Sequence, residues 1–101
     1  MIEVQIPASI KVGGFDYNIK IDVKTDEELK GHGWRGSQCE YSRDIEIMST
    51  LRPQEFSSIA IHELLHAVSL VYGVDLCEHD NGVLANGLHQ VMEQLGVRFV
   101  K

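Results

Sequence analysis

A single small α+β domain is the fold class that this 101-residue sequence predicts. Short runs in the first half alternate apolar and polar residues, as half-buried β-strands do. Two longer segments in the second half repeat apolar residues at helical spacing. The length suits one hydrophobic core and is too short for two, so we expect one domain over residues 1–101.

The first part of the chain, residues 2–23, predicts a β-hairpin with one buried face. Gly13-Gly14 breaks a run of alternating apolar residues: Val4, Ile6, Ile10, Val12, Tyr17, Ile19, Ile21 and Val23. Residues 25–29 then carry a helix-start signature, but the glycines at 31, 33 and 36 predict that the helix soon ends in a flexible loop. We expect His32, within that loop, to be solvated.

Two further strands are predicted over residues 38–41 and 44–48, with a tight connection at Ser42-Arg43. Pro53 and the residues after it favour a helix start, so a first long helix is expected over residues 53–72, stopped by Gly73. A second helix is expected over residues 77–95, capped by Gly96, and a short strand over residues 97–100. The residues of this second helix expected to face the core are Leu84, Leu88, Val91 and Leu95.

Composition and charge exclude several classes of partner. The formal net charge is -6 and the nine basic residues are scattered, which argues against a nucleic-acid surface and against a polybasic membrane patch. No secretory signal opens the chain and no segment approaches a membrane span, so we expect a cytoplasmic protein. Cys39 and Cys77 form no C-x-x-C pair and are expected to be reduced thiols.

Residues 59–68 set two histidines and a glutamate in an otherwise apolar helix. Residues four apart share a helix face, so His62 and His66 can bind one metal ion together. With Glu63 they form the H-E-x-x-H arrangement of zinc hydrolases, in which the glutamate is free to take a proton from metal-bound water. The alternative is a pair of core histidines bonded to backbone carbonyls, with Glu63 reaching solvent. Burying such groups without metal or partners costs roughly several kcal/mol, which favours the metal site.

A third ligand is needed, because a catalytic zinc takes three protein ligands and a water. The opening turn of the second helix offers Glu78, His79 and Asp80. We favour Glu78, because it shares a face with small residues that let two helices approach closely: Asn81, Gly82 and Ala85. Residues 75–78 also match a capping box, in which Glu78 would fold back onto its own helix start. The alternatives to Glu78 as the third ligand are therefore a capping role for Glu78, with His79 or Asp80 as the ligand.

The chain resembles the small H-E-x-x-H proteins encoded by phages and prophages. The resemblance lies in Ile-His-Glu-Leu-Leu-His-Ala-Val at 61–68, Tyr-Gly at 72–73, Glu78, Leu-Ala-Asn-Gly-Leu at 84–88, and the Ile-Pro to Asp-Tyr-Asn-Ile stretch at 6–19. It implies a minimal zincin of the gluzincin type, with a small, mainly antiparallel sheet packed on the active-site helix and Glu78 from the C-terminal helix as third ligand. More distantly, the chain looks like the phage metallopeptidases that cleave repressors, which carry additional segments.

We therefore expect a zinc peptidase in which His62, His66 and Glu78 bind Zn²⁺ and Glu63 is the general base, acting on a peptide or protein substrate. Candidates for stabilising the oxyanion are Tyr41, Tyr72, His79 and His89. The rival hypothesis is a non-catalytic phage module that binds a protein and uses zinc to stabilise a small domain. Glu63, which a structural zinc does not require, favours the enzyme. No feature of the sequence indicates an oligomeric state.

Overall fold

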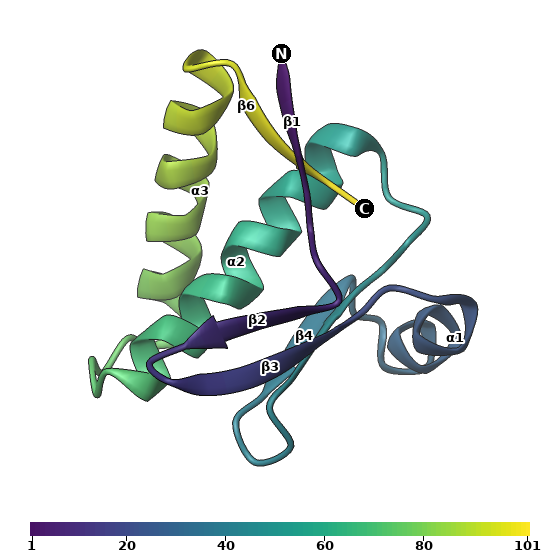
Figure 1. Cartoon of the computed structure of the whole chain (residues 1–101), viewed down its shortest axis with the longest axis vertical. Coiled ribbons are helices and arrows are strands. Elements are labelled where there is room, and N and C mark those ends of the chain that lie inside the picture. The colour runs from purple at the N-terminus through teal and green to yellow at the C-terminus, as the bar shows by residue number, and fades with distance from the viewer.

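Three helices and six short strands form the structure, a computed structural model that describes all residues from Met1 to Lys101 (Figure 1). The α+β class is confirmed. In chain order the elements are β1 (Ile2–Gln5), β2 (Ser9–Val12), β3 (Phe15–Lys20), α1 (Val23–His32), β4 (Gly36–Cys39), β5 (Asp44–Ile47), α2 (Pro53–Val71), α3 (Glu78–Gln94) and β6 (Val97–Val100). No helix has the combination of length and apolar character needed to cross a membrane.

The sheet that packs on α2 is mixed, and the expectation of a mainly antiparallel sheet holds for two of its three strand pairings. The four-stranded sheet has the order β2-β3-β5-β4, in which β2–β3 and β4–β5 are antiparallel and β3–β5 is parallel. The parallel pair is possible because α1 and β4 lie between β3 and β5 in the chain and form a crossover. A separate parallel pair joins β1 to β6.

The predicted N-terminal hairpin is shorter than expected. Gly13 and Gly14 form its turn with φ values of +58° and +88°, a backbone conformation that glycine adopts without strain. The hairpin joins β2 to β3, whereas β1 leaves it and pairs with the other end of the chain. Its last predicted residue, Val23, begins α1 instead. The alternation of apolar and polar residues thus predicted where the strands lie, but not which strands pair with each other.

Helix α1 contains the predicted helix start at residues 25–29 and extends to His32, where a flexible loop was expected. Asp22 caps it by accepting a hydrogen bond from the Thr25 N–H at 2.7 Å, and the helix continues through Gly31, whose cost is about 1 kcal/mol at one position. It ends at Gly33, where φ is +72°. The Gly33 N–H donates to the Lys30 carbonyl and the Trp34 N–H to the Leu29 carbonyl. This Schellman arrangement fixes where Trp34 leaves the helix.

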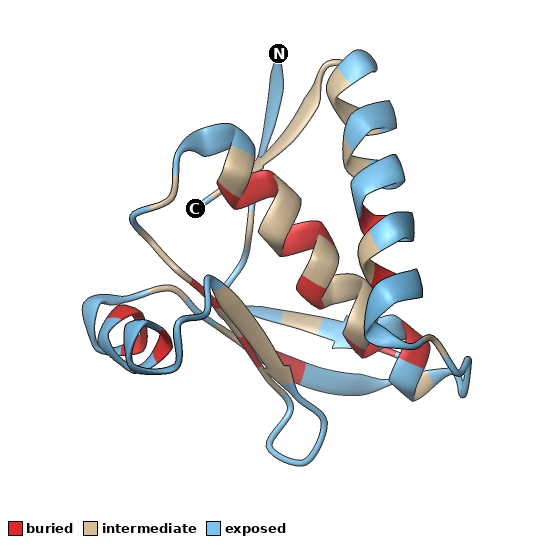
Figure 2. Cartoon of the chain, turned by 180° about the vertical axis from the view of Figure 1, so that it is seen from behind, coloured by how far each residue is buried: buried red, intermediate tan, exposed pale blue.

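Helix α2 lies between the sheet and α3 (Figures 1 and 2), and its bounds agree with the predicted 53–72 to within a residue. One side of it packs on the sheet. The buried residues of this core come from both layers: Val12, Tyr17, Ile45, Ile47, Phe56, Ala60 and Ala67. Gly36 lets β4 come close to the helix, since a Cβ there would lie 2.6 Å from Ile59 Cγ2. The sheet therefore approaches α2 beside the H-E-x-x-H motif.

The predicted core stripe of α3 is wrong. Leu84, Leu88, Val91 and Leu95 are exposed, and the buried residues of this helix are Asn81 and Ala85. Helix α3 is the outer layer, with α2 and β6 on its inner side, and its outward face is mostly exposed (Figure 2). Its small residues face α2 because they permit close packing of the two helices. Gly96 follows α3 with a φ of +78°, which agrees with its predicted role at the helix end.

Replacing Gly36 with alanine tests the close approach of β4 to α2. We expect Gly36→Ala to lower the free energy of unfolding by about 1–3 kcal/mol, because the new methyl group would also meet the Glu46 carbonyl and Glu63 Cγ, both at 3.1 Å. Gly87→Ala is the control, since nothing lies within 4 Å of its added carbon and alanine favours a helix by about 1 kcal/mol. Urea unfolding measures both. Wild-type stability in Gly36→Ala would contradict this packing.

Candidate metal centre

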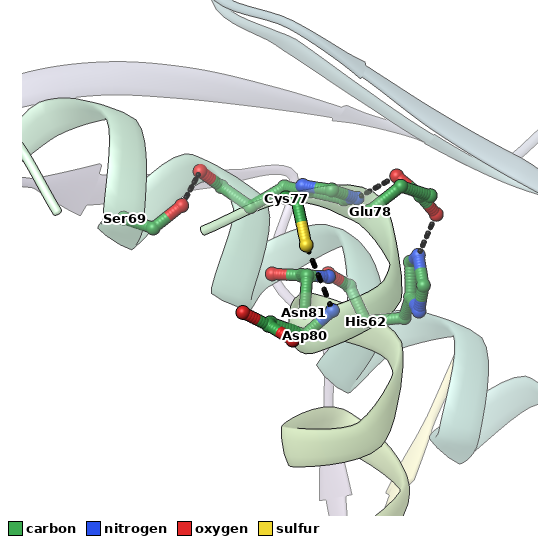
Figure 3. Close-up of polar contacts among 7 residues, drawn as sticks. His62, Ser69, Cys77, Glu78, Asp80 and Asn81 are labelled. Atoms are coloured by element: carbon green, nitrogen blue, oxygen red, sulfur yellow. Dashed lines mark hydrogen bonds and ion pairs between the residues drawn. The ribbon is translucent and has the colours of Figure 1, made fainter. Parts of the chain in front are cut away.

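Glu78 lies between the two histidines of the motif. One carboxylate oxygen, Oε1, is 3.0 Å from His62 Nε2, and the other, Oε2, is 2.8 Å from His66 Nε2 (Figure 3). The imidazoles stand one turn apart on α2, with ring centroids separated by 4.9 Å and ring planes at 74°. One ligand atom from each of the three residues lies within 4.8 Å of the others. The structure thus brings together the three predicted ligands.

These three residues lie close enough together to bind a metal ion, and their donor atoms are of the kinds that zinc takes. Tetrahedral zinc with nitrogen and oxygen ligands at about 2.0–2.1 Å separates neighbouring ligand atoms by roughly 3.3 Å. The contacts to Glu78 are slightly shorter, and its side chain is 74 % exposed, so it can withdraw by a few tenths of an ångström. With two imidazoles and one carboxylate as its protein ligands, a bound zinc would have a fourth position for water.

The start of α3 favours Glu78 as a ligand over Glu78 as part of a cap. The N-cap residue is Cys77, whose Sγ accepts a hydrogen bond from the Asp80 N–H at 3.4 Å, so the capping box at residues 75–78 is not formed. His79 and Asp80 are exposed and do not belong to the three-residue cluster. Cys77, expected to be a reduced thiol, is free and also caps the start of α3.

Asn81 ties α3 to the first of the two histidines. Its side chain is completely buried, and its Nδ2 donates a hydrogen bond to the His62 backbone carbonyl at 3.2 Å (Figure 3). Asn81 follows Glu78 by three residues, so both lie on the α3 face that contacts α2. The sequence predicts Asn81 only as one of the small residues between the two helices, and does not predict this hydrogen bond. The feature of the sequence that could have indicated this bond is the polar side chain of Asn81 among the small residues Gly82 and Ala85.

Glu63 is buried beside this cluster, with 7 % of its surface exposed. Burial raises the pKa of its carboxyl to about 7, and the negative charge of Glu78 adds to the effect. A carboxyl with a pKa near neutrality can both accept and return a proton at physiological pH. A divalent cation held by the cluster would favour the ionised form of Glu63 and so oppose this shift.

A hollow of about 380 Å³ opens over the cluster. Its lining combines the motif with the strand opposite: Trp34, Gly36, Ser37, Gln38, His62, Glu63, His66 and Glu78. Trp34 is 51 % exposed and stacks on His32, with centroids 4.4 Å apart. His32 is exposed as predicted, but it lies at the end of α1 and not in a loop. The sequence did not predict that Trp34 and residues 36–38 line this hollow, because nothing in the local sequence relates them to α2.

None of the four oxyanion candidates lines this hollow. Tyr41 lines a different hollow at the far end of β4, and Tyr72 is exposed at the end of α2. His79 is exposed on α3, whereas His89 lies 4.0 Å from Glu93, away from the cluster. Cys39 and Cys77 are free, exposed thiols outside the hollow.

Comparison of the chain with protein-family models, with curated proteins and with solved structures finds no match.

The role of Glu78 can be tested by measuring zinc affinity. We expect Glu78→Gln to weaken zinc binding by well over tenfold, because an amide is a poorer ligand than a carboxylate, and to keep α3, whose cap is Cys77. Asp80→Asn is the matched control, with the same chemical change two residues away, and should bind zinc as the wild type does. Competition with a chromophoric chelator gives both affinities. Equal affinities for Glu78→Gln and Asp80→Asn would remove Glu78 from the ligand set.

The pKa of Glu63 predicts how the stability of the metal-free protein varies with pH. Because the folded carboxyl holds its proton up to about pH 7 and the unfolded one only to about 4.5, stability falls as pH rises through this interval. Glu63→Gln should remove that dependence and be more stable than wild type at pH 8 by up to about 3 kcal/mol. Urea unfolding in EDTA at pH 5 and pH 8 measures the difference. Parallel pH profiles for the two proteins would contradict it.

Proposed function

We propose that this protein is a zinc-dependent peptidase of minimal zincin type, with His62, His66 and Glu78 as the zinc ligands and Glu63 as the general base. The observation that carries the proposal is the burial of Glu63 next to the three-residue cluster. A metal that only stabilised the fold would need no fourth ionisable group there. Keeping an extra carboxyl buried is unfavourable, so its presence supports a role in proton transfer.

Each side chain then has a defined task. Bound zinc would lower the pKa of a water ligand to about 7 and polarise the scissile carbonyl. Glu63 takes the proton from the attacking water and returns it to the departing amine nitrogen. Asn81 holds the α2 backbone at His62 against α3, so that the two imidazoles and Glu78 keep their relative positions. The hollow is open enough for a peptide to reach the cluster.

Strand β4 supports a peptide as the substrate, because it is the edge of the sheet and forms one wall of the hollow. The Met48 N–H donates to the Arg35 carbonyl, so residues 35, 37 and 39 direct their backbone polar groups towards β5. Gly36 and Gln38 consequently present theirs to the free edge. An extended peptide that adds to this edge would make backbone hydrogen bonds beside the zinc ligands.

A zinc-stabilised module that binds a peptide without cutting it is the second candidate. The same strand edge supports it, and so does the link that Glu78 makes between α3 and α2, because a metal there would join two elements of a small domain. The two candidates differ in the part played by Glu63. The module requires no proton transfer.

Glu63→Gln separates the candidates. We expect this variant to bind zinc as the wild type does and to lose hydrolysis by at least about a hundredfold, since glutamine has the same size but cannot accept a proton. Cleavage of a peptide library by zinc-loaded protein measures activity. Trp34 is the single tryptophan and lines the hollow, so its fluorescence reports peptide binding in both forms. Wild-type cleavage rates in the variant would exclude Glu63 as the base. Equal binding by both forms with no cleavage by either would establish the module.

A further inference from the structure

A second hollow, of about 430 Å³, lies at the C-terminal end of β4. Five of its seven lining residues are aliphatic or aromatic, and the seven come from three parts of the chain: Phe15, Tyr17, Glu40, Tyr41, Arg43, Leu70 and Val71. It shares no lining residue with the hollow over the metal cluster. Its volume is in the lower part of the range for sites that bind small molecules or side chains.

The two elements that flank the metal cluster continue to this second hollow. On α2, Leu70 follows His66 by four residues, one turn, which is about 6 Å along the helix. In the chain, Glu40 is the first residue after β4 and follows Gln38 by two residues, which is about 7 Å when extended. Both spacings correspond to two residues of an extended peptide. A peptide paired with β4 would therefore place a side chain here, two residues from the one beside the zinc ligands.

Arg43 indicates which side chains fit. Its backbone is left-handed, with a φ of +56°, a conformation that costs a non-glycine residue about 1 kcal/mol. Its guanidinium lies 4.3 Å from the centroid of the Phe15 ring and takes part in none of the ion pairs. Glycine or asparagine would relieve the backbone strain at this turn position. An arginine stacked on an aromatic ring instead extends the wall of the hollow with a flat, cationic surface.

We propose that this hollow is a specificity subsite for a large apolar side chain, preferably an aromatic one, of a peptide that pairs with β4. The proposal rests on the proposed peptide-binding cleft at the metal centre. The apolar lining gains free energy from burying such a side chain, and the guanidinium can face an aromatic ring of the ligand. An aspartate at the same peptide position would lose part of its hydration, and the Glu40 carboxylate in the lining would offset the attraction of Arg43.

The test uses zinc-loaded protein and peptides that carry Phe, Leu, Ala or Asp at either position two residues from the cleaved bond. We expect kcat/KM to favour Phe over Ala by at least about tenfold at one of these positions, and to disfavour Asp. Leu70→Ala should reduce the Phe preference at least about threefold. Leu88→Ala is the matched control, because Leu88 is similarly exposed on α3 and far from β4.

Arg43→Gly provides a second variant that is expected to fold well, since glycine relieves the left-handed strain. It should reduce the Phe preference while retaining at least wild-type stability in urea. Equal kcat/KM for Phe and Ala peptides in the wild type would overturn the subsite. So would a Phe preference that stays unchanged in both Leu70→Ala and Arg43→Gly.

Binding to zinc-loaded Glu63→Gln, followed by Trp34 fluorescence, separates this proposal from the proposed peptidase function. If no peptide is cut but Phe peptides bind at least tenfold more tightly than Ala peptides, and Leu70→Ala removes the difference, the subsite is supported and the peptidase is not. If peptides are cut with no preference at these positions, the peptidase stands and the subsite fails. Absence of both cleavage and selective binding overturns both.

Discussion

The burial of α2 on two sides is the constraint on which the rest of this structure depends. The sheet packs on one side of the helix through Phe56, Ala60 and Ala67, and α3 packs on another. Neither the sheet nor α3 has a comparable apolar partner elsewhere, so each contributes to the fold through its contact with α2. The same helix carries both histidines. The position of the candidate metal ligands and the stability of the domain are therefore properties of one packed element.

This arrangement places unfavourable electrostatics on the helix that carries the core, where Glu63 lines the hollow beside the cluster. Glu63 is buried, and Glu78 adds a second negative charge nearby, which together raise the pKa of the Glu63 carboxyl. In a domain of this size, where net stability is about 5–15 kcal/mol, such a group is a substantial burden. A divalent cation between the imidazoles would compensate both carboxylates at once. The buried acid and the three-residue cluster thus make physical sense as one unit rather than as two separate features.

Local patterns predicted the parts of the molecule that depend on local contacts. The i, i+4 spacing of His62 and His66 and the breaking effect of Gly13-Gly14 depend on backbone geometry over a few residues, and α2 was located to within a residue. The prediction that Leu84, Leu88, Val91 and Leu95 face the core was wrong, because periodicity shows which residues share a face but not whether another element covers that face. The parallel β3–β5 pair and the position of Trp34 in the lining of the hollow depend on contacts between residues more than twenty positions apart, which no local pattern contains.

The pairing of β1 with β6 also determines how the structure responds to mechanical force. Ile2 pairs with Val97 and Gln5 with Val100, so the two strands run side by side in the same direction (Figure 1). Tension applied between Ile2 and Val100 pulls the strands past each other along their length. Their hydrogen bonds are then loaded together in shear instead of opening one after another, as they would in an antiparallel hairpin pulled from its open end. Force applied between the two strands must therefore break this small ladder before it reaches α2 and the candidate metal ligands.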